Sequence, residues 1–508
     1  MGNQNSSQKK KSSAQTSPTH QAQSGEPSSP MKAGMIRSPS GADFQDKSHT
    51  KFGPTEELSK LLARKNESEG SGSNGVTDQI FTKYVFPRHP DLGMRLFRHF
   101  HTLSHAKTQH LGVTAFRQQC ERFLSVLDDG KIIEMYVRIF CNPNEENASM
   151  EGIKNLLKCS FSIAMDHYSG EAQTCPSIEL TLDAVIATCF FQEPLSVGFI
   201  TRWLEENCPR LVLPVHKYCV HLLTTTYRCI RLNTEDKTGN GLELATPLLE
   251  IGAPFGSSVP LLNLSTAWLL AGTLPQTYAR PTSAPKKDDD TATNPATSPS
   301  SALPSQIMLS KLVAVVPSHW TLLYDTRIHG VGANRFLHHV LGYRGPNLVI
   351  LHARSLKDQT EKVYCVASPS EWRETNLYIG GEESCLIQVQ PKFAVMEKGG
   401  KILYLNTHIR GYPKGLRVAV DPRNPIIAVD EHFEKLDVHS ITHTLLNIEV
   451  WGCGDKSSRD IQLDIKKWQV KEAERQRTVK LSAADWVDNP DRYLLELGGR
   501  PQYNNSNK

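Results

Sequence analysis

Three groups of residues in this chain have the types and spacings that chemistry requires. Gly2 stands directly behind the initiating methionine, where an acyl chain can be attached. Glu382 and Glu383 are adjacent carboxylates, the side chains that general acid and base catalysis often uses. His439 and His443 have the spacing of two metal ligands on one face of a helix. Whether any of these groups acts depends on the elements that position it.

The N-terminus has the pattern of a lipid-modified arm. In MGNQNSS, Gly2 and Ser6 meet the Met-Gly-x-x-x-Ser pattern for removal of the methionine and myristoylation of the Gly2 amine. One myristoyl chain binds a bilayer only marginally, so stable anchoring requires a second signal. Lys9, Lys10 and Lys11 provide one, since each basic residue near an anionic leaflet adds roughly 1 kcal/mol. We expect Gly2 to be myristoylated; the alternative is a disordered tail in which this glycine is incidental.

The two side-chain pairs make weaker cases for chemistry. Adjacent residues on a strand point to opposite faces, so Glu382 and Glu383 in GGEES cannot face each other as acid and base. A turn-capping or surface role is expected instead. The segment DVHSITHTLLN is rich in β-branched residues and predicts a loop entering a strand, rather than the helix that a His439–His443 metal site needs. No third ligand follows, so half-buried or surface histidines are expected.

Other catalytic motifs are missing from the sequence. The glycines form no phosphate-binding GxGxxG or Walker motif, and no Gly-x-Ser-x-Gly carries a nucleophilic serine. Cys365 and Cys385 lie in apolar, strand-like runs, where a low-pKa thiolate is disfavoured. We therefore expect no enzyme activity, no catalytic residue, no metal and no cofactor.

Calcium binding is the remaining rival for the N-terminal half. An EF-hand loop needs oxygen ligands at positions 1, 3, 5 and 12 and a glycine at position 6. The best window begins at Asn142, but Asn147 stands at the glycine position and Ile153 at the last ligand position. The bidentate carboxylate is therefore lacking. We expect a helix–loop–helix frame that serves as a packed adaptor, with a degenerate calcium sensor as the alternative.

Composition restricts the compartment and the classes of partner. The net charge of +4 and the pI near 8.4 are too mild to indicate a nucleic-acid partner. The N-terminus is polar, unlike a secretory signal, and the longest apolar stretch, at 259–272, is too short to span a bilayer. Eleven cysteines without a CxxC pair fit a reducing compartment. Membrane contact is thus expected on the cytoplasmic face, by anchoring.

Changes in composition divide the chain into five segments. Residues 1–76 are rich in Ser, Gln, Lys, Gly and Pro, which predicts a disordered arm. Residues 77–280 repeat apolar residues at i, i+3, i+4 and i+7, which predicts a helical adaptor domain. Residues 281–305 form a linker rich in Pro, Ser and Thr. Residues 306–455 carry β-prone runs, and residues 456–508 predict a C-terminal helical extension and tail.

The runs after the linker predict an antiparallel β fold. KFAVMEKGGKILYL predicts a hairpin that turns at Gly399 and Gly400, and NRFLHHVLGY predicts a short helix that stops at Gly342. Two antiparallel sheets with flanking helices would bury the strands. The predicted strands occupy residues 347–353, 362–368, 385–390, 392–397, 401–406, 416–421, 425–430 and 445–451.

The C-terminal half resembles the TLDc domain family. The markers occur in family order: a Leu-Tyr-Asp strand, a helix leading to Gly-Pro, an SPSEW segment, YIGGEESCLIQVQ and a closing IEVWG. The resemblance covers residues 306–455. It implies an α+β fold, with an N-terminal helical, degenerate EF-hand-like domain followed by a TLDc two-sheet β-sandwich with flanking helices. The motif residues with an implied structural or partner-binding role are Tyr324, Gly345, Pro346, Trp372, Gly380, Glu382, Glu383 and Trp451.

The two ends of the chain narrow this resemblance to one branch of the family. The Met-Gly-Asn start and NPDRYLLELGG are similar to the myristoylated lysosomal TLDc proteins that are associated with mTOR. This resemblance implies a non-enzymatic peripheral membrane regulator on the cytoplasmic face of lysosomes or endosomes, with a cytosolic pool. The implied partners are anionic lipid and either subunits of the vacuolar proton-pumping ATPase or components of the mTOR complex, with no nucleic acid. The alternative is a cytosolic protein of oxidative-stress protection.

Two segments near the C-terminus leave their contacts open. KKWQVKEAERQRTVKL carries few apolar residues among its charges, so its helix is either solvent-facing or bound by a partner. WVDNPDRYLLELGG has a compact apolar face, which either docks on the domain core or engages another protein.

Overall fold

The fold was analysed in a computed structural model of the 508-residue chain. The structure describes residues 53–69, 75–141, 146–166, 175–191, 194–231, 261–279, 316–317 and 319–477. The predicted lipidation site Gly2 and the lysines at 9–11 lie outside these ranges. None of the helices within them combines the length and the hydropathy that a membrane-spanning helix needs.

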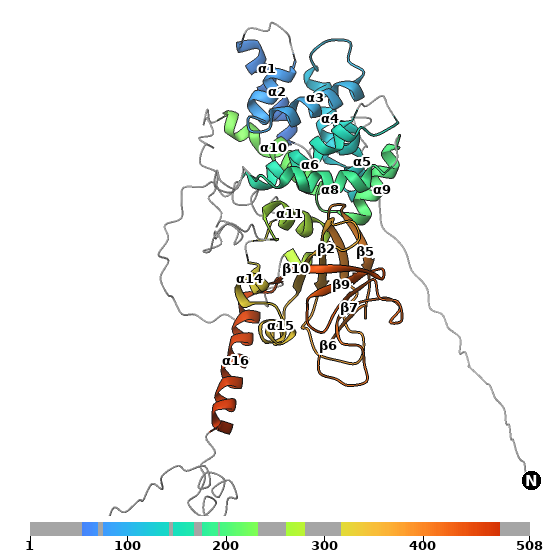
Figure 1. Ribbon diagram of the computed structural model, residues 1–508. Helices are drawn as coiled ribbons and strands as arrows, with labels where there is room; N and C mark the ends of the chain where they lie inside the picture. Colours follow the sequence, from blue (N-terminus) through green and yellow to red (C-terminus); the bar gives the residue numbers. More distant parts are fainter. Residues whose placement is uncertain are drawn as a thin grey trace, which may run out of the picture. The chain divides into compact units, whose positions relative to one another are not determined.

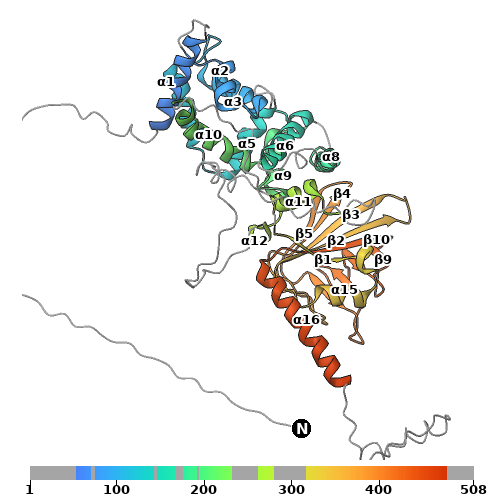
Figure 2. The same cartoon turned by 90° about the vertical axis from the view of Figure 1, so that its left-hand side faces the viewer.

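The N-terminal part of the described chain is built from short amphipathic helices (Figures 1 and 2). Several begin at a side-chain cap: Thr77, Asp128, Ser149 and Ser196 each accept a hydrogen bond from a backbone amide three residues further on. The helices are α1 (Gly53–Ser68), α2 (Asp78–Val85), α3 (Pro90–Ser104), α4 (Val113–Leu124), α5 (Asp129–Phe140), α6 (Met150–Met165), α8 (Ile178–Cys189), α9 (Val197–Asn207), α10 (Leu213–Arg231), α11 (Leu264–Thr273) and α12 (Gln276–Ala279).

The loops between these helices pair with one another. Val76 and Leu111 exchange two backbone hydrogen bonds (2.8 and 2.9 Å), which link the α1–α2 loop to the α3–α4 loop. Asn147 and Ser196 form a second antiparallel bridge, between the loops before α6 and α9. The region is thus made of helix–loop–helix units joined in pairs through their loops, the frame that the sequence predicted. Most of the candidate EF-hand ligands, at 142–145, lie outside the described residues.

The predicted disordered arm at 1–76 is wrong in its last part, because α1 is a packed helix. Leu58 and Leu62 are fully buried against α4 and α10. Asn66, also buried, accepts a hydrogen bond from the Thr77 hydroxyl (3.1 Å), which connects α1 to the cap of α2. The leucines stand on one face of the helix, but the polar residues on both sides of this short segment masked that periodicity in the sequence.

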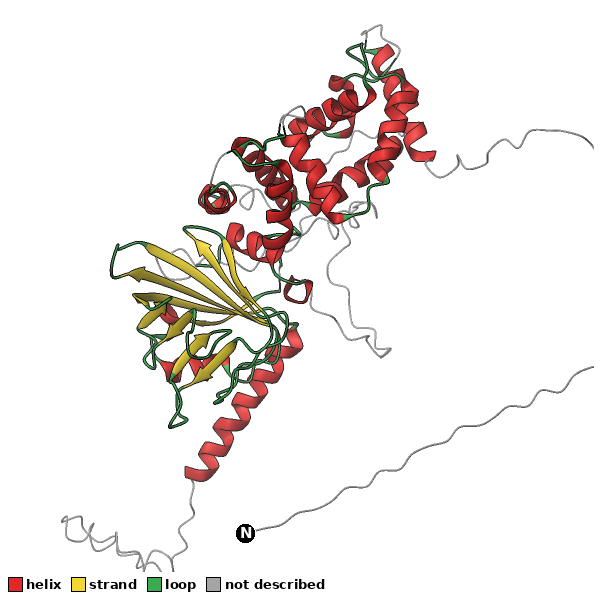
Figure 3. Ribbon diagram, turned by 90° about the vertical axis from the view of Figure 1, so that its right-hand side faces the viewer, coloured by secondary structure: helices red, strands yellow, loops and turns green. Residues whose placement is uncertain are grey.

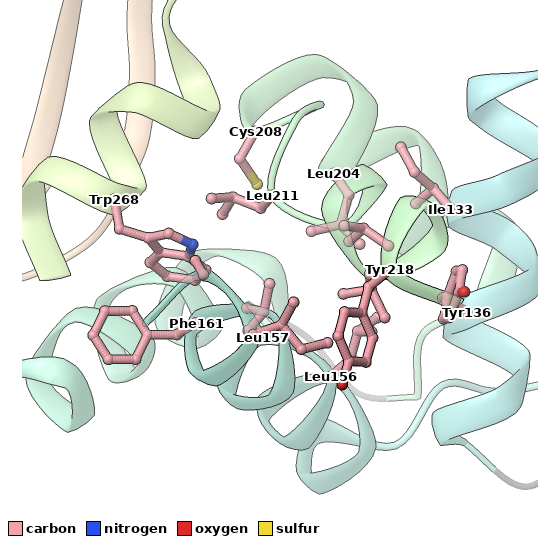
Figure 4. Close-up of a cluster of buried hydrophobic side chains, with 14 of the residues drawn as sticks. Ile133, Tyr136, Leu156, Leu157, Phe161, Leu204, Cys208, Leu211, Tyr218 and Trp268 are labelled. Atoms are coloured by element: carbon pink, nitrogen blue, oxygen red, sulfur yellow. The ribbon is translucent and has the colours of Figure 1, made fainter. Parts of the chain in front are cut away.

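The core of the helical region is closed by α11. Phe161 in α6 and Trp268 in α11 meet edge to face, with ring centroids 5.4 Å apart (Figure 4). Leu157 and Leu211 lie beside them, and all four side chains are buried. An edge-to-face aromatic pair contributes about 1 kcal/mol beyond the area it buries. These contacts fix α11 to the helices that precede it in the chain.

The C-terminal part is an antiparallel sheet with flanking helices, so the fold class is α+β, as predicted (Figure 3). Ten strands form one hydrogen-bonded sheet in the order β5-β4-β3-β2-β10-β9-β8-β7-β6, with β1 also paired to β10. The strands are β1 (Thr321–Asp325), β2 (Asn347–Ser355), β3 (Glu361–Ser368), β4 (Cys385–Gln390), β5 (Ala394–Lys398), β6 (Leu403–Asn406), β7 (Gly415–Val418), β8 (Ile427–Val429), β9 (Lys435–Val438) and β10 (Ile441–Gly452).

The long strand β10 joins the two halves of this sheet. Along one edge its first residues pair with β9 and its last residues pair with β1, while β2 pairs along the other edge. The apolar side chains on one face of β2–β4 and those of β6–β9 belong to one core cluster, so the two halves enclose it between them. The predicted two-sheet sandwich therefore has a continuous hydrogen-bonded connection through β10.

Strand β2 is buried on both of its faces. Val349 and Leu351 belong to the core inside the sheet, whereas Leu348 and Ile350 belong to the cluster that the helical region forms. A strand covered on both sides has no polar face, which explains the uninterrupted apolar run NLVIL in the sequence.

The predicted hairpin at Gly399–Gly400 is wrong. Strands β5 and β6 lie at opposite ends of the sheet order, and β6 pairs with β7 instead. The backbone between them bonds to the GGEES segment: Gly399 N donates to Ser384 O (3.0 Å), and Leu403 bridges to Ile379. The two glycines thus carry the chain from one half of the sheet to the other. A turn motif alone does not show that the two strands on either side of it pair with each other.

Three helices flank the sheet: α14 (Thr326–His329), α15 (Ala333–Val340) and α16 (Lys456–Arg477). Helix α15 ends just before Gly342, close to the predicted stop. The first half of α16 packs on the end of α15, and Trp468 and Val470 in its second half are exposed, as expected for the charged segment. The predicted terminal helix in WVDNPDRYLLELGG lies outside the described residues.

The burial of α1 leads to a first test. Leu62→Ala is expected to lower the free energy of unfolding by about 2–5 kcal/mol, because it removes a fully buried side chain from the core. Arg64→Ala changes an exposed position of the same helix and is expected to stay within about 0.5 kcal/mol. Urea unfolding followed by far-UV circular dichroism measures both. Equal effects of the two substitutions would contradict the packing of α1.

Candidate functional site

A buried carboxylate on β10 connects the helical region to the sheet. Glu449 has no exposed surface, and its two oxygens accept hydrogen bonds from the backbone amides of Leu261 (2.8 Å) and Leu262 (3.2 Å). They also accept from Arg327 Nη2 (2.6 Å) and Trp451 Nε1 (3.1 Å). Three separate stretches of chain therefore donate to one carboxylate.

The charges around Glu449 form a compact group. Arg327, on α14, also donates to Asp325 (2.7 Å), so one guanidinium lies between two buried carboxylates. Burial raises the pKa of Glu449, while the Leu261 amide, Trp451, the Leu262 amide and Arg327 oppose that rise. The hydrogen bonds that Arg327 donates to Asp325 raise the pKa of Arg327. A buried carboxylate is stable only when donors replace its lost water, and here four do so.

The local sequence explains why the two amides are available. Leu261 and Leu262 precede Asn263, whose side chain caps α11 by accepting from Thr266 N (3.0 Å). The amides just before this cap are outside the helix and have no partner within it. They point at Glu449 instead. Helix α11 is thus fixed to the helical core by Trp268 and to the sheet by the segment at its N-terminus.

A second contact forms at the GGEES turn. The Thr277 hydroxyl on α12 donates to Glu383 Oε2 (2.7 Å), and the Tyr278 hydroxyl donates to the Glu383 backbone carbonyl (3.0 Å). Trp320 Nε1, just before β1, donates to the Tyr278 carbonyl (2.8 Å). Glu382, its neighbour, is exposed and lines a groove of about 330 Å³. The adjacent glutamates occupy a turn, and Glu383 forms hydrogen bonds with the helical region.

The edge strand β5 is covered from the same side. Phe393 N donates to Ala184 O in α8 (2.9 Å), and Lys398 Nζ donates to Glu206 O in α9 (2.9 Å). An uncovered edge strand is a template for aggregation. The helical region therefore protects one end of the sheet.

Comparison with known families identifies the C-terminal part of the chain. Residues 297–454 match the model of the TLDc domain. This part of the chain is a TLDc domain. The match agrees closely with the interval predicted from the ordered motifs, 306–455. No curated protein matches the chain.

The aromatic motif residues of the TLDc domain are buried and hold its loops. Tyr324 OH donates to Gly330 O (2.8 Å), and Trp372 Nε1 donates to Asn347 Oδ1 (2.6 Å). Trp451 lies next to Glu449 in the group described above. The Tyr324 and Trp372 contacts do not meet in one site, which assigns these two residues to the stability of the domain.

The motif glycines stand where a side chain would collide. At Gly345, beside Pro346, a Cβ would lie 2.9 Å from the Cα of Gly454; here the Pro346 carbonyl accepts from Cys453 N (2.7 Å). Gly380 has a φ of +119°, and a Cβ on it would lie 2.6 Å from Ser384 Oγ. A positive φ of this kind favours glycine. Both positions serve close chain contacts.

The remaining candidate residues form no reactive constellation. His439 is exposed in the turn between β9 and β10, whereas His443 is buried, beyond the half-burial expected, and donates from Nδ1 to Ile441 O (2.8 Å). Burial raises the pKa of Cys385 to about 12 and that of Cys365 well above its usual value. Within the described ranges no three His, Cys, Asp or Glu side chains gather as metal ligands.

Glu449 was not predicted from the sequence, although its position as a single charge in an apolar run indicates a special role. The run LLNIEVWG predicts a buried strand, and a single charged residue in such a run needs a partner. The partners, Arg327 and the amides before α11, are more than a hundred residues away in sequence. Their proximity could not be predicted without the strand order.

Replacing the central carboxylate gives a second test. Glu449→Gln is expected to lower the free energy of unfolding by about 3 kcal/mol, because it leaves Arg327 without one of its charge partners in a buried setting. Glu431→Gln is the control, since Glu431 pairs with Lys414 at 2.6 Å on the surface. Its expected cost is much smaller, because solvent screens an exposed ion pair. Equal costs in urea unfolding would contradict the role of Glu449.

Proposed function

We propose that this chain is a non-enzymatic peripheral membrane regulator that acts through protein–protein contacts at the endolysosomal surface. The observation that carries the proposal is the TLDc domain at 297–454, since this domain is associated in general with oxidative-stress and vacuolar proton-pumping ATPase roles. Subunits of that ATPase or components of mTOR signalling are the proposed partners.

The proposed attachment to the membrane comes from the N-terminal sequence. Gly2 and Ser6 fit the myristoylation pattern, and three lysines follow at 9–11. The acyl chain supplies marginal affinity, and the lysines add attraction to anionic lipid. This combination selects an anionic leaflet, and the choice of organelle then depends on the protein partner.

The hydrogen bonds of Glu449 and Glu383 support a regulator that works as one folded body. They join the helical region to the TLDc domain through α11 and α12. A partner that binds either region would therefore be linked mechanically to the other. This is the property expected of an adaptor that positions two surfaces at a membrane.

Thiol-based protection against oxidants is the alternative from another class. It requires thiolates that oxidants can reach. Cys365 and Cys453 have no exposed surface, and burial raises the pKa of both thiols. These positions favour a core role for the cysteines over redox chemistry.

The anchoring step is tested with Gly2→Ala in the full-length chain expressed in cells. Mass spectrometry of the N-terminal peptide is expected to show a myristoyl group on the unsubstituted protein and none on the variant. Flotation with phosphatidylserine vesicles is expected to fall to background, because the lysines alone bind weakly. Gly25→Ala, a glycine change elsewhere in the same arm, is expected to float like the parent.

Proximity labelling in cells identifies the neighbours of the parent protein, of Gly2→Ala and of Gly25→Ala. The parent and Gly25→Ala are expected to label lysosomal and proton-pump neighbours, whereas Gly2→Ala should lose them. If Gly2→Ala labels the same neighbours, or if the parent retains an unmodified terminus, membrane anchoring is not the basis of this function.

A further inference from the structure

A group of basic side chains lies where α15 meets the first half of α16. Figures 1 and 2 show these two helices side by side. The buried side chain of Gln462 on α16 fixes this contact, because its Nε2 donates to the carbonyls of His339 (2.9 Å) and Leu341 (3.1 Å). The last carbonyls of α15 thus already have a donor.

Two histidines face each other at this contact. The rings of His329, at the end of α14, and His339, on α15, have centroids only 4.0 Å apart. Tyr324 stacks on His329 at 5.8 Å. The amide of Asp325 donates to His329 Nδ1 (3.0 Å), so the neutral ring carries its proton on Nε2. Within the described part of the chain, this N–H has no hydrogen-bond acceptor.

Two further basic side chains lie at this contact. Arg459 and Lys466 stand on the same face of α16 as Gln462, at i, i+3 and i+7, and both are half-buried. Burial and the neighbouring Arg459 lower the pKa of Lys466 to about 8. Burial, then His329 and Lys466, lower the pKa of His339 to about 4. Because Gln462, on the same face of α16, donates to His339 O (2.9 Å), this face lies against the histidine pair.

The acidic groups nearby are engaged elsewhere. Asp325 pairs with Arg327, and Asp464 on α16 is exposed and pairs with Lys467. Asp455 accepts hydrogen bonds from Ser457 and Ser458. Among the described residues neither Arg459 nor Lys466 forms an ion pair. Half-buried cations without a counter-charge are costly, and a bound anion removes that cost.

We propose that His329, His339, Arg459 and Lys466 form a binding site for a phosphate group. The guanidinium, whose Nη1 already donates to Gln462 Oε1, supplies its remaining N–H donors. The ammonium supplies a point charge, and the imidazoles supply N–H donors that gain charge when an anion binds. Arg335, which donates to His329 O (2.9 Å), adds positive charge at the rim. The group can belong to a free phosphate or to a phosphorylated lipid headgroup.

Sulfate is the first probe, because it keeps its two charges across the pH range of the experiment. Calorimetric titration of the full chain is expected to give saturable binding that strengthens from about pH 8 to about pH 5. The sign follows because a bound dianion raises the pKa of both imidazoles, so falling pH favours the complex. Vesicles with and without a phosphoinositide then show whether a lipid headgroup is the source.

Lys466→Met is expected to weaken sulfate binding by about tenfold or more, since one charge-assisted contact is lost. Lys467→Met is the matched control, because that exposed neighbour pairs with Asp464, and its binding should be unchanged. Lys466→Arg keeps the charge and should retain most of the affinity. Without anion, Lys466→Met is expected to melt at a higher temperature than the parent, because an uncompensated half-buried charge is gone.

Each outcome decides the proposal. The proposal is supported if Lys466→Met binds sulfate more weakly than the parent while Lys467→Met binds it equally well. If binding to phosphoinositide vesicles is weakened in Lys466→Met but not in Lys467→Met, the phosphate group belongs to a lipid headgroup. Absence of binding by both sulfate and vesicles overturns it, as does equal weakening in Lys466→Met and Lys467→Met. Circular dichroism of each variant separates loss of the site from loss of the fold, and Lys466→Arg keeps the test valid if Lys466→Met does not fold.

Discussion

The arrangement of this protein depends on one buried carboxylate. Glu449 lies in the middle strand of the sheet, where an unpaired charge would be strongly unfavourable. Its stability requires donors from α14, from β10 itself and from the segment that leads into α11. The last of these belongs to a different region of the chain. The TLDc domain therefore contains a buried carboxylate that needs hydrogen-bond donors, and the segment before α11 in the helical region supplies two of them.

Apolar contacts on the outer face of the sheet join the same two regions. Leu348 and Ile350 project from β2 toward the helical cluster, and α8 and α9 bond to the edge strand β5. Trp268 connects the same assembly to the helical core. Apolar burial supplies most of the free energy, and the carboxylate adds a geometric requirement, because its donors must arrive from fixed directions. The two contributions explain why α11 is the element that joins both regions.

Local structure was largely predictable from the sequence, and long-range pairing was not. The helices at 94–227 and the strands β2–β8 and β10 follow from periodicity and β-branched runs. Strand β1 was expected only from the Leu-Tyr-Asp marker of the family resemblance, and β9 was not predicted. The prediction of a hairpin at Gly399–Gly400 was wrong because the pairing of β6 with β7 depends on the order of strands in the whole sheet. Helix α1 was not predicted because polar neighbours masked the periodicity of its leucines. The ordered motifs predicted the TLDc domain, but Glu449 and the basic group around Lys466 depend on contacts that sequence spacing does not encode.

The helical region and the TLDc domain are joined through two backbone amides, those of Leu261 and Leu262, which donate hydrogen bonds to Glu449. Native-state hydrogen exchange of the unsubstituted protein tests this connection most directly. We expect the amides of Leu261 and Leu262 to exchange as slowly as those of β10, because both sets of hydrogen bonds break only when the core opens. Exchange of these two amides at the rate of an exposed loop, with β10 still protected, would contradict it.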